Sequence, residues 1–230
     1  MNVERRVLLK GMALGSLAGV AMSSSGLSMA NTVLGGQSRT ALPTLALVSG
    51  DVAESAFLEG VTASPAARQV KVQRTDLSLD FILGLEKRLN SGQPQRIIGL
   101  VDDASAALII DLARSAGARV QWLGQHRATA NSSAHRLLSA EAASGCAPQL
   151  GLHLNACGTG FSLSEQRMGG QQAPLQLSAA ARSSAGSEQW AATLGYSLAA
   201  LGTTHTGEAP LVASRKSPLT GNFVSFSIEA

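Results

Sequence analysis

The stretch that decides the fold is IIGLVDDASAALIIDLARSAGARVQWL, residues 97–123. It begins with an apolar run, 97–101, of the length expected for a strand buried on both faces. Two aspartates follow, one of which is expected to cap a helix over 104–116 that Gly117 ends. Residues 119–123, with apolar Val120, Trp122 and Leu123, predict a further strand that completes the stretch. Strand, helix and strand in this order predict a βαβ unit with parallel strands.

The residues before this stretch repeat the same alternation. Apolar residues 45–48 and the alternating residues 70–72 each predict a strand. Each is followed by apolar residues at helical spacing, over 53–61 and 81–89. Residues 42–127 therefore predict an α/β fold with an open, mostly parallel sheet, Rossmann-like or flavodoxin-like, and helices on both faces.

The C-terminal part, residues 128–230, has a weaker pattern. Ala134, Leu137 and Leu138 are spaced as in a short helix, whereas Leu residues alternate with polar residues over 150–154 as in a half-buried strand. The Gly-, Ser- and Gln-rich segment 158–186 is expected to be mostly surface loop. Beyond it we expect a helix over 187–201 and a strand over 224–228, at an edge of the sheet or antiparallel. No boundary divides residues 31–230, so one α/β domain with a less regular C-terminal part is expected.

The charge of the chain argues against a nucleic-acid-binding protein. The formal net charge is +3, but residues 1–30 contribute three basic groups against the single acidic Glu4. The rest of the chain carries 15 basic and 14 acidic groups, which is close to neutral. A nucleic-acid interface needs a basic stripe on the domain itself, and the aromatic content of 3% is too low for a platform on which bases stack.

The first thirty residues have the organisation of an export signal. A charged segment ends at Lys10, an apolar segment spans 11–22, and Ser28-Met29-Ala30 offers small residues at the two positions that a signal peptidase reads. The apolar segment is shorter than the roughly 20 residues that cross a bilayer. We therefore expect cleavage after Ala30 and no permanent membrane anchor.

The residues Arg5-Arg6-Val7-Leu8-Leu9-Lys10 resemble the twin-arginine (Tat) translocation signal. Arg5, Arg6 and Lys10 carry the resemblance; Glu4 stands where Ser or Thr is usual, and Leu8 where Phe is commonest. The resemblance covers the leader alone and implies a bacterial protein that folds in the cytoplasm and reaches the periplasm through the Tat translocase. General secretion is the alternative interpretation, because ordinary secretory signals also carry basic residues.

The two cysteines are interpreted in the light of this export signal. In an oxidising compartment, Cys146 and Cys157 are expected to form a disulfide that closes a short loop. Unpaired thiols are a second interpretation. A metal site is a third, with His153 between the cysteines and His126 as a possible fourth ligand, although the spacing matches no common zinc pattern.

Candidate binding residues lie at the carboxyl ends of the predicted strands, where open α/β sheets bind ligands. The alternative for each aspartate is that it caps the helix that follows, although adjacent aspartates exceed what one cap requires. His135, in contrast, is expected on the solvated surface of a helix. The candidate ligand-binding residues are Ser49, Asp51, Asp102, Asp103, His126 and Arg127.

The sequence supports two function classes. The sequence has no Gly-rich phosphate turn, nucleophile elbow or paired-cysteine redox motif, so the cofactor, if any, is unknown. The lack of a catalytic motif favours a periplasmic protein that binds a small ligand or serves a redox enzyme as an accessory. The alternative is a metal-dependent hydrolase, in which carboxylates and an imidazole hold a metal ion that activates water. Its candidate residues are Asp51, Asp102, Asp103 and His126.

Overall fold

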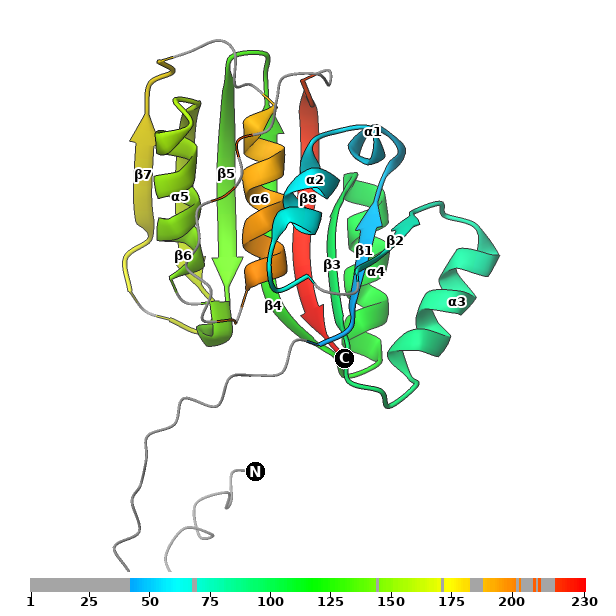
Figure 1. The fold of residues 1–230 in the computed structure, drawn as a ribbon. Coiled ribbons are helices and arrows are strands. Elements are labelled where there is room, and N and C mark those ends of the chain that lie inside the picture. Colours follow the sequence, from blue (N-terminus) through cyan, green and yellow to red (C-terminus); the bar gives the residue numbers. More distant parts are fainter. Residues whose placement is uncertain are drawn as a thin grey trace, which may run out of the picture. The chain divides into compact units, whose positions relative to one another are not determined.

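The computed structural model describes residues 42–67, 70–143, 145–170, 172–182, 188–201, 203, 209, 211 and 218–230. Arg5, Arg6, Lys10 and the rest of the predicted leader lie outside these residues. Eight strands form one sheet (Figure 1). Their order across the sheet is β2 (Val70–Arg74), β1 (Thr44–Val48), β3 (Arg96–Val101), β8 (Gly221–Glu229), β4 (Arg119–Ala128), β5 (Ser132–Ser139), β6 (Gly160–Arg167) and β7 (Leu175–Ala179).

The sheet is mixed, so the predicted mostly parallel sheet is wrong. Of the seven pairings between the described strands, those of β1 with β2, β1 with β3 and β5 with β6 are parallel, and the other four are antiparallel. The antiparallel pair β6–β7 and two further features cause the difference. β8 enters between β3 and β4 and runs antiparallel to both, and β4 and β5 form a hairpin. β8 was expected at an edge or antiparallel; it is antiparallel but central.

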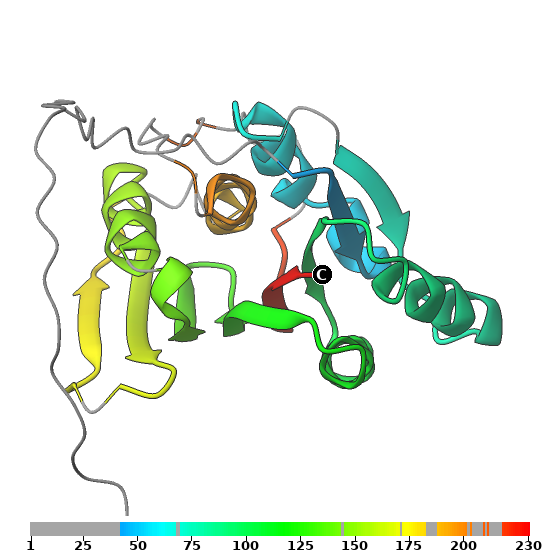
Figure 2. The same ribbon diagram turned by 90° about the horizontal axis from the view of Figure 1, so that it is seen from below.

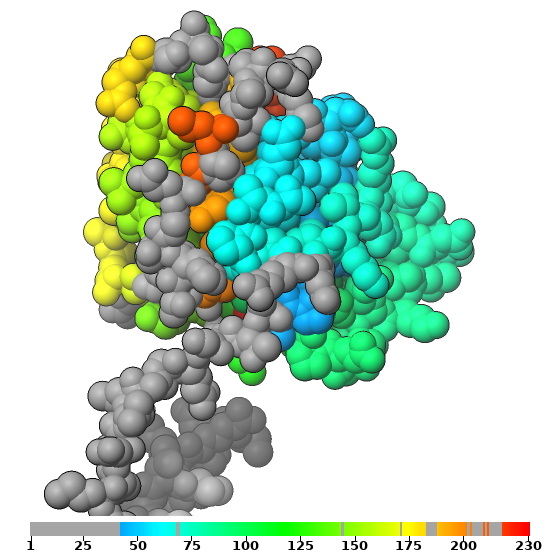
Figure 3. All heavy atoms as spheres, viewed as in Figure 1, coloured from blue at the N-terminus to red at the C-terminus, as the bar shows by residue number. Residues whose placement is uncertain are grey.

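Helices cover the two faces of the sheet unequally (Figure 2). One face carries α1 (Gly50–Ala53), α2 (Phe57–Ala63), α5 (Cys146–Ala156) and α6 (Gln189–Ala200), which share a buried apolar cluster with β1, β3, β4, β5, β6 and β8. In the space-filling view of this face, atoms of α2 and α5 lie at the surface (Figure 3). None of the described helices is long and apolar enough to cross a membrane.

The opposite face is covered over only part of its width. There α3 (Leu79–Leu89) and α4 (Asp103–Ser115) bury a second apolar cluster against β1, β3, β4 and β8. That cluster contains no residue of β5, β6 or β7, and outward-facing residues such as Arg136 and Ser162 are exposed. Among the described elements, this side of β5, β6 and β7 therefore forms a helix-free face.

Two segments have the opposite secondary structure to the one predicted: a predicted helix is a strand, and a predicted strand is a helix. The segment expected to contain a short helix is β5, in which Ser133, His135, Leu137 and Ser139 alternate as buried residues. The segment expected to be a strand is α5, in which Leu150 and Leu154 are buried and Leu152 is 67% exposed. A short 3₁₀ turn, η1 (Glu141–Ala143), joins them. The segment expected to be mostly loop contains β6 and β7.

α2 and α6 approach each other closely because glycines lie at their contact. A Cβ atom built on Gly60 would lie 1.8 Å from the carbonyl oxygen of Ala192, and one built on Gly195 would lie 2.2 Å from that of Phe57. Real Cβ atoms do not reach such distances. Glycine at both positions therefore lets the two helix backbones touch.

Candidate functional site

Asp102 serves as the N-cap of α4. Its carboxylate accepts hydrogen bonds from the Ser105 backbone N–H at 2.8 Å and from the Ser105 hydroxyl at 2.8 Å. Burial alone would raise its pKa, but these hydrogen bonds outweigh burial and leave the pKa of Asp102 below its ordinary value of 3.8. The helix cap thus accounts for this member of the predicted site.

The predicted site residues Ser49, Asp51 and Asp103 also lie at the starts of helices. Ser49 precedes α1, and Asp51 lies exposed in the first turn of that helix. Asp103 lies exposed in the first turn of α4, where a negative charge is favourable. Within the described part of the chain, no three His, Cys, Asp or Glu side chains are grouped so that they could hold a metal ion.

His126 of β4 lies in the core, paired with His135 of β5. The two residues are direct partners in the hairpin, and each is 2% exposed. Their Nδ1 atoms are 2.8 Å apart, and His126 Nε2 is 2.7 Å from the hydroxyl oxygen of Ser225 on β8. His135 Nε2 is 2.9 Å from the Ser133 hydroxyl oxygen. Both ring nitrogens of His126 are therefore engaged inside the protein.

When both imidazoles are neutral, the hydrogen-bond chain requires that they have complementary tautomers. Trp122 Nε1–H can only donate, and it donates to Ser225 Oγ at 2.9 Å. If the Ser225 hydroxyl donates to His126 Nε2, then His126 Nδ1–H donates to His135 Nδ1 and His135 Nε2–H donates to Ser133. The reverse order from Ser133 to Ser225 also balances, but in either order only one Nδ1 carries a hydrogen.

Aromatic rings enclose the histidine pair. The ring centroid of Trp190 on α6 lies 5.8 Å from that of His126 and 5.7 Å from that of His135, and Phe223 lies 6.2 Å beyond Trp190. Burial lowers the pKa of His135 from 6.5 to about 4. Burial, with repulsion from a charged His135, holds the pKa of His126 well below 6.5. Both imidazoles are thus neutral at pH 7.

The cysteines lie at opposite ends of α5, and no disulfide joins them. A helix rises about 1.5 Å per residue, which separates their Cα atoms by roughly 16 Å, whereas a disulfide needs about 7 Å or less. This arrangement does not join the two cysteines, and the bridge stays a prediction. Burial raises the pKa of the Cys157 thiol, against a hydrogen bond with Thr193 that lowers it, so this thiol is a poor nucleophile at pH 7.

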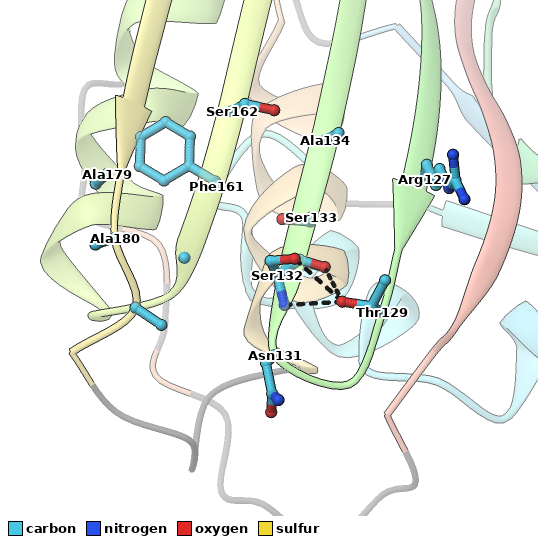
Figure 4. A pocket seen from close by; sticks show the side chains of 12 residues that line it. Arg127, Thr129, Asn131, Ser132, Ser133, Ala134, Phe161, Ser162, Ala179 and Ala180 are labelled. Carbon is cyan, nitrogen blue, oxygen red and sulfur yellow. Dashed lines mark hydrogen bonds between the residues drawn. The ribbon is translucent and has the colours of Figure 1, made fainter.

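A hollow of about 420 Å³ lies at the turn between β4 and β5, next to the start of β6 and the end of β7. Figure 4 shows Thr129 and Ser132 joined by hydrogen bonds at this turn, with Arg127 on one side and Phe161 on the other. We call it the Arg127 hollow. Its lining residues are Arg127, Thr129, Asn131, Ser132, Ser133, Ala134, Gly160, Phe161, Ser162, Ala179, Ala180 and Ala181.

The hollow is lined from both sides of the strands: Ser133, whose hydroxyl bonds His135, belongs to the side of the histidine pair, and Arg127 and Ala134 belong to the other side. Successive side chains of a strand point to opposite faces. His126 and His135 point toward α6, so their neighbours Arg127 and Ala134 point to the helix-free face. Of the predicted site residues, Arg127 alone lines the hollow.

Sequence reasoning overlooked the partners of His126. Alternation of buried and exposed residues over Ser133, His135 and Leu137 was the available indication that His135 lies in a strand facing the core. The adjacent Leu137 and Leu138 obscured it by fitting a helix as well. Ser225 and Trp122 come together with His126 only through strand pairing across the sheet, which has no local signature.

Comparison with known proteins gives this site no precedent, because no family model matches the chain and neither a curated protein nor a solved structure was found to be similar to it.

Proposed function

We propose that this protein binds a small anionic ligand in the Arg127 hollow, and that it does so in the periplasm. The observation that carries the proposal is the chemistry of the lining. Arg127 is the charged residue among the lining residues, and no carboxylate accompanies it. A guanidinium group offers a planar set of donors that suits carboxylate, sulfate or phosphate oxygens.

The rest of the lining fits a small polar molecule. Thr129, Ser132, Ser162 and the Asn131 amide offer hydrogen-bonding groups, while Phe161 and several alanines supply apolar surface. The hollow also falls in the range of about 300–1,000 Å³ typical of sites for small ligands. A few polar groups around an apolar floor give orientation as well as affinity.

The arrangement does not favour a metal-dependent hydrolase. The carboxylates of Asp102 and Asp103 belong to the start of α4, whereas His126 is enclosed in the core with both ring nitrogens bonded. These residues would have to leave their present partners before they could share an ion. We therefore place binding, rather than hydrolysis, at the centre of the proposal.

The experiment uses sulfate as the probe, because sulfate keeps its charge over the working pH range. Amide chemical shifts of the full chain are followed by NMR during a sulfate titration at about pH 7.5. We expect saturable shifts at the β4–β5 turn and at the start of β6. Arg127→Gln should weaken binding by about tenfold or more, since it removes the charged hydrogen bonds.

Arg136→Gln is the matched control. Arg136 lies on the neighbouring strand β5 and is exposed on the helix-free face, but it does not line the hollow. Both variants remove one positive charge from the same face, so a general charge effect would weaken binding equally in both. Equal losses, or shifts that never saturate in the wild-type protein, would overturn the proposal.

A further inference from the structure

We propose that the His126–His135 pair makes the Arg127 hollow acid-sensitive: protonation of the pair opens the β4–β5 hairpin and releases the anion. This inference rests on the proposed function, and it assigns a regulatory role to a buried pair that ligand binding alone does not use. The opening itself can be measured without any ligand.

The geometry of the hairpin couples the two sites. His126 pairs with His135, and the next partners along the hairpin are Arg127 with Ala134 and Ala128 with Ser133. The pair therefore lies next to residues that line the hollow, and His135 Nε2 is 2.9 Å from the hydroxyl oxygen of the lining residue Ser133. If the imidazoles separate, the Arg127–Ala134 pairing must change, and Arg127 loses its place beside the turn.

The chemistry of the pair makes a second proton difficult to accept. The neutral pair is held by one hydrogen between two Nδ1 atoms 2.8 Å apart. A first added proton can enter at an Nε2 atom if the serine hydroxyl bonded there turns to accept, but it places a charge beneath Trp190. A second added proton places a hydrogen on both Nδ1 atoms, and the two N–H groups that then face each other repel.

The surroundings do little to compensate such a charge. From β8, the pair faces the neutral residues Ser225 and Phe223, and from α6 it faces Trp190. Glu165 on β6 and Glu188 at the start of α6 are the buried carboxyl groups of the packed elements, and Glu165 already accepts a hydrogen bond from Ser139. Arg127 and Arg136 lie on the opposite face of the strands and add positive charge. Burial remains the dominant influence on both imidazoles.

The direction of the pH effect follows from linkage. The closed hairpin holds the pKa of His135 at about 4, whereas an opened, hydrated hairpin returns it toward 6.5. Protons therefore bind the open form more tightly, and closure is lost progressively as the pH falls from about 6.5 toward 4. For His135 alone, the ratio of open to closed hairpins should rise about 20-fold at pH 5 relative to pH 7.

The test compares sulfate dissociation constants of the full chain at about pH 7.5 and pH 5. We expect the apparent dissociation constant to rise in the wild-type protein in proportion to the fall of the closed population. This direction distinguishes the proposal from general electrostatics, because acid neutralises carboxylates and would otherwise strengthen anion binding. In the double variant H126N/H135N, whose amides can still bond each other but do not titrate, the affinity should not weaken at low pH.

His153→Gln is the matched control, because it removes a histidine on α5 that contacts Tyr196 rather than the pair. It should keep the pH dependence of the wild-type protein. If the double variant does not fold, the single variant His135→Asn replaces it; with one titrating ring, it should show a weaker dependence. Wild-type affinity that is unchanged or stronger at pH 5 would overturn the proposal.

Hydrogen exchange separates the two proposals. After correction for the intrinsic pH dependence of exchange, amides of the β4–β5 hairpin that are buried and bonded should open about tenfold or more often at pH 5, whereas amides of β1 and β3 should not. Absence of sulfate binding at about pH 7.5 contradicts the proposed function and leaves this measurement intact. Sulfate binding combined with uniform exchange at both pH values contradicts the acid-sensitive hairpin.

Discussion

Asp102 and Asp103 are adjacent in the sequence, but they differ in what they bond. Asp102 accepts hydrogen bonds from the backbone N–H and the hydroxyl of Ser105, whereas Asp103 lies exposed in the first turn of α4. The sequence predicts that one of two adjacent aspartates caps the helix, and the structure identifies that residue. The sequence could not reveal His135 as a core residue, because a polar side chain enters the core only when other strands supply its hydrogen-bond partners.

We predict that Asp102→Ala lowers the free energy of unfolding by about 1 kcal/mol, because an N–H at the start of α4 loses its acceptor. Asp103→Ala should cost less than about 0.5 kcal/mol, as expected for an exposed residue. Urea unfolding at neutral pH measures both. The lowered pKa of Asp102 means that its contribution is present above about pH 4 and fades as the pH falls through the folded-state pKa. Equal losses in the two variants would contradict the assignment of the cap.

At the level of elements, long and strongly patterned segments could be predicted and short ambiguous ones could not. α4 and β3 have runs of apolar residues whose spacing fits one structure alone. β5 and α5 have few large apolar residues, and their leucines fit either period. Tertiary packing decides such cases: α5 buries Leu150 and Leu154 and leaves Leu152 to solvent.

The contact between α2 and α6 gives a sharp prediction at this scale. Gly60→Ala should destabilise the protein by about 1–3 kcal/mol or more, because the added methyl group forces the helices apart. Gly84→Ala is the matched control: Gly84 is exposed on α3, and nothing lies within 4 Å of the position that its added methyl group would take. Because alanine favours helices, the control should be neutral or stabilising by up to about 1 kcal/mol. Thermal unfolding compares the two, and a Gly60 variant as stable as the control would disprove the close contact.

At the level of the whole molecule, the parallel part of the sheet could be predicted and the antiparallel part could not. β2, β1 and β3 alternate with helices along the chain, so local patterns lead to their parallel pairing. The position of β8 depends on a pairing with β3 across more than a hundred residues, such as Ile98 with Ser227. No local feature of 221–229 specifies a central place rather than an edge.

The export proposal also concerns the whole molecule. Changing Arg5 and Arg6 together to Lys should leave an uncleaved precursor in the cytoplasm. The leader resembles a Tat signal, and recognition of such a signal depends on the guanidinium groups of its paired arginines. Fractionation of the producing cells followed by mass measurement checks this. Normal amounts of mature protein in the periplasm of the variant strain would favour general secretion instead.

The central place of β8 has a consequence for biosynthesis. Until residues 221–229 leave the ribosome, β3 and β4 have no partner between them, and each presents an open edge in a growing chain. The two parts of the sheet can therefore join only after β8 has been translated, and until then the nascent chain presents two edges that favour aggregation. A messenger RNA truncated just before this strand would yield a product with two exposed strand edges, which cellular proteases would be expected to remove.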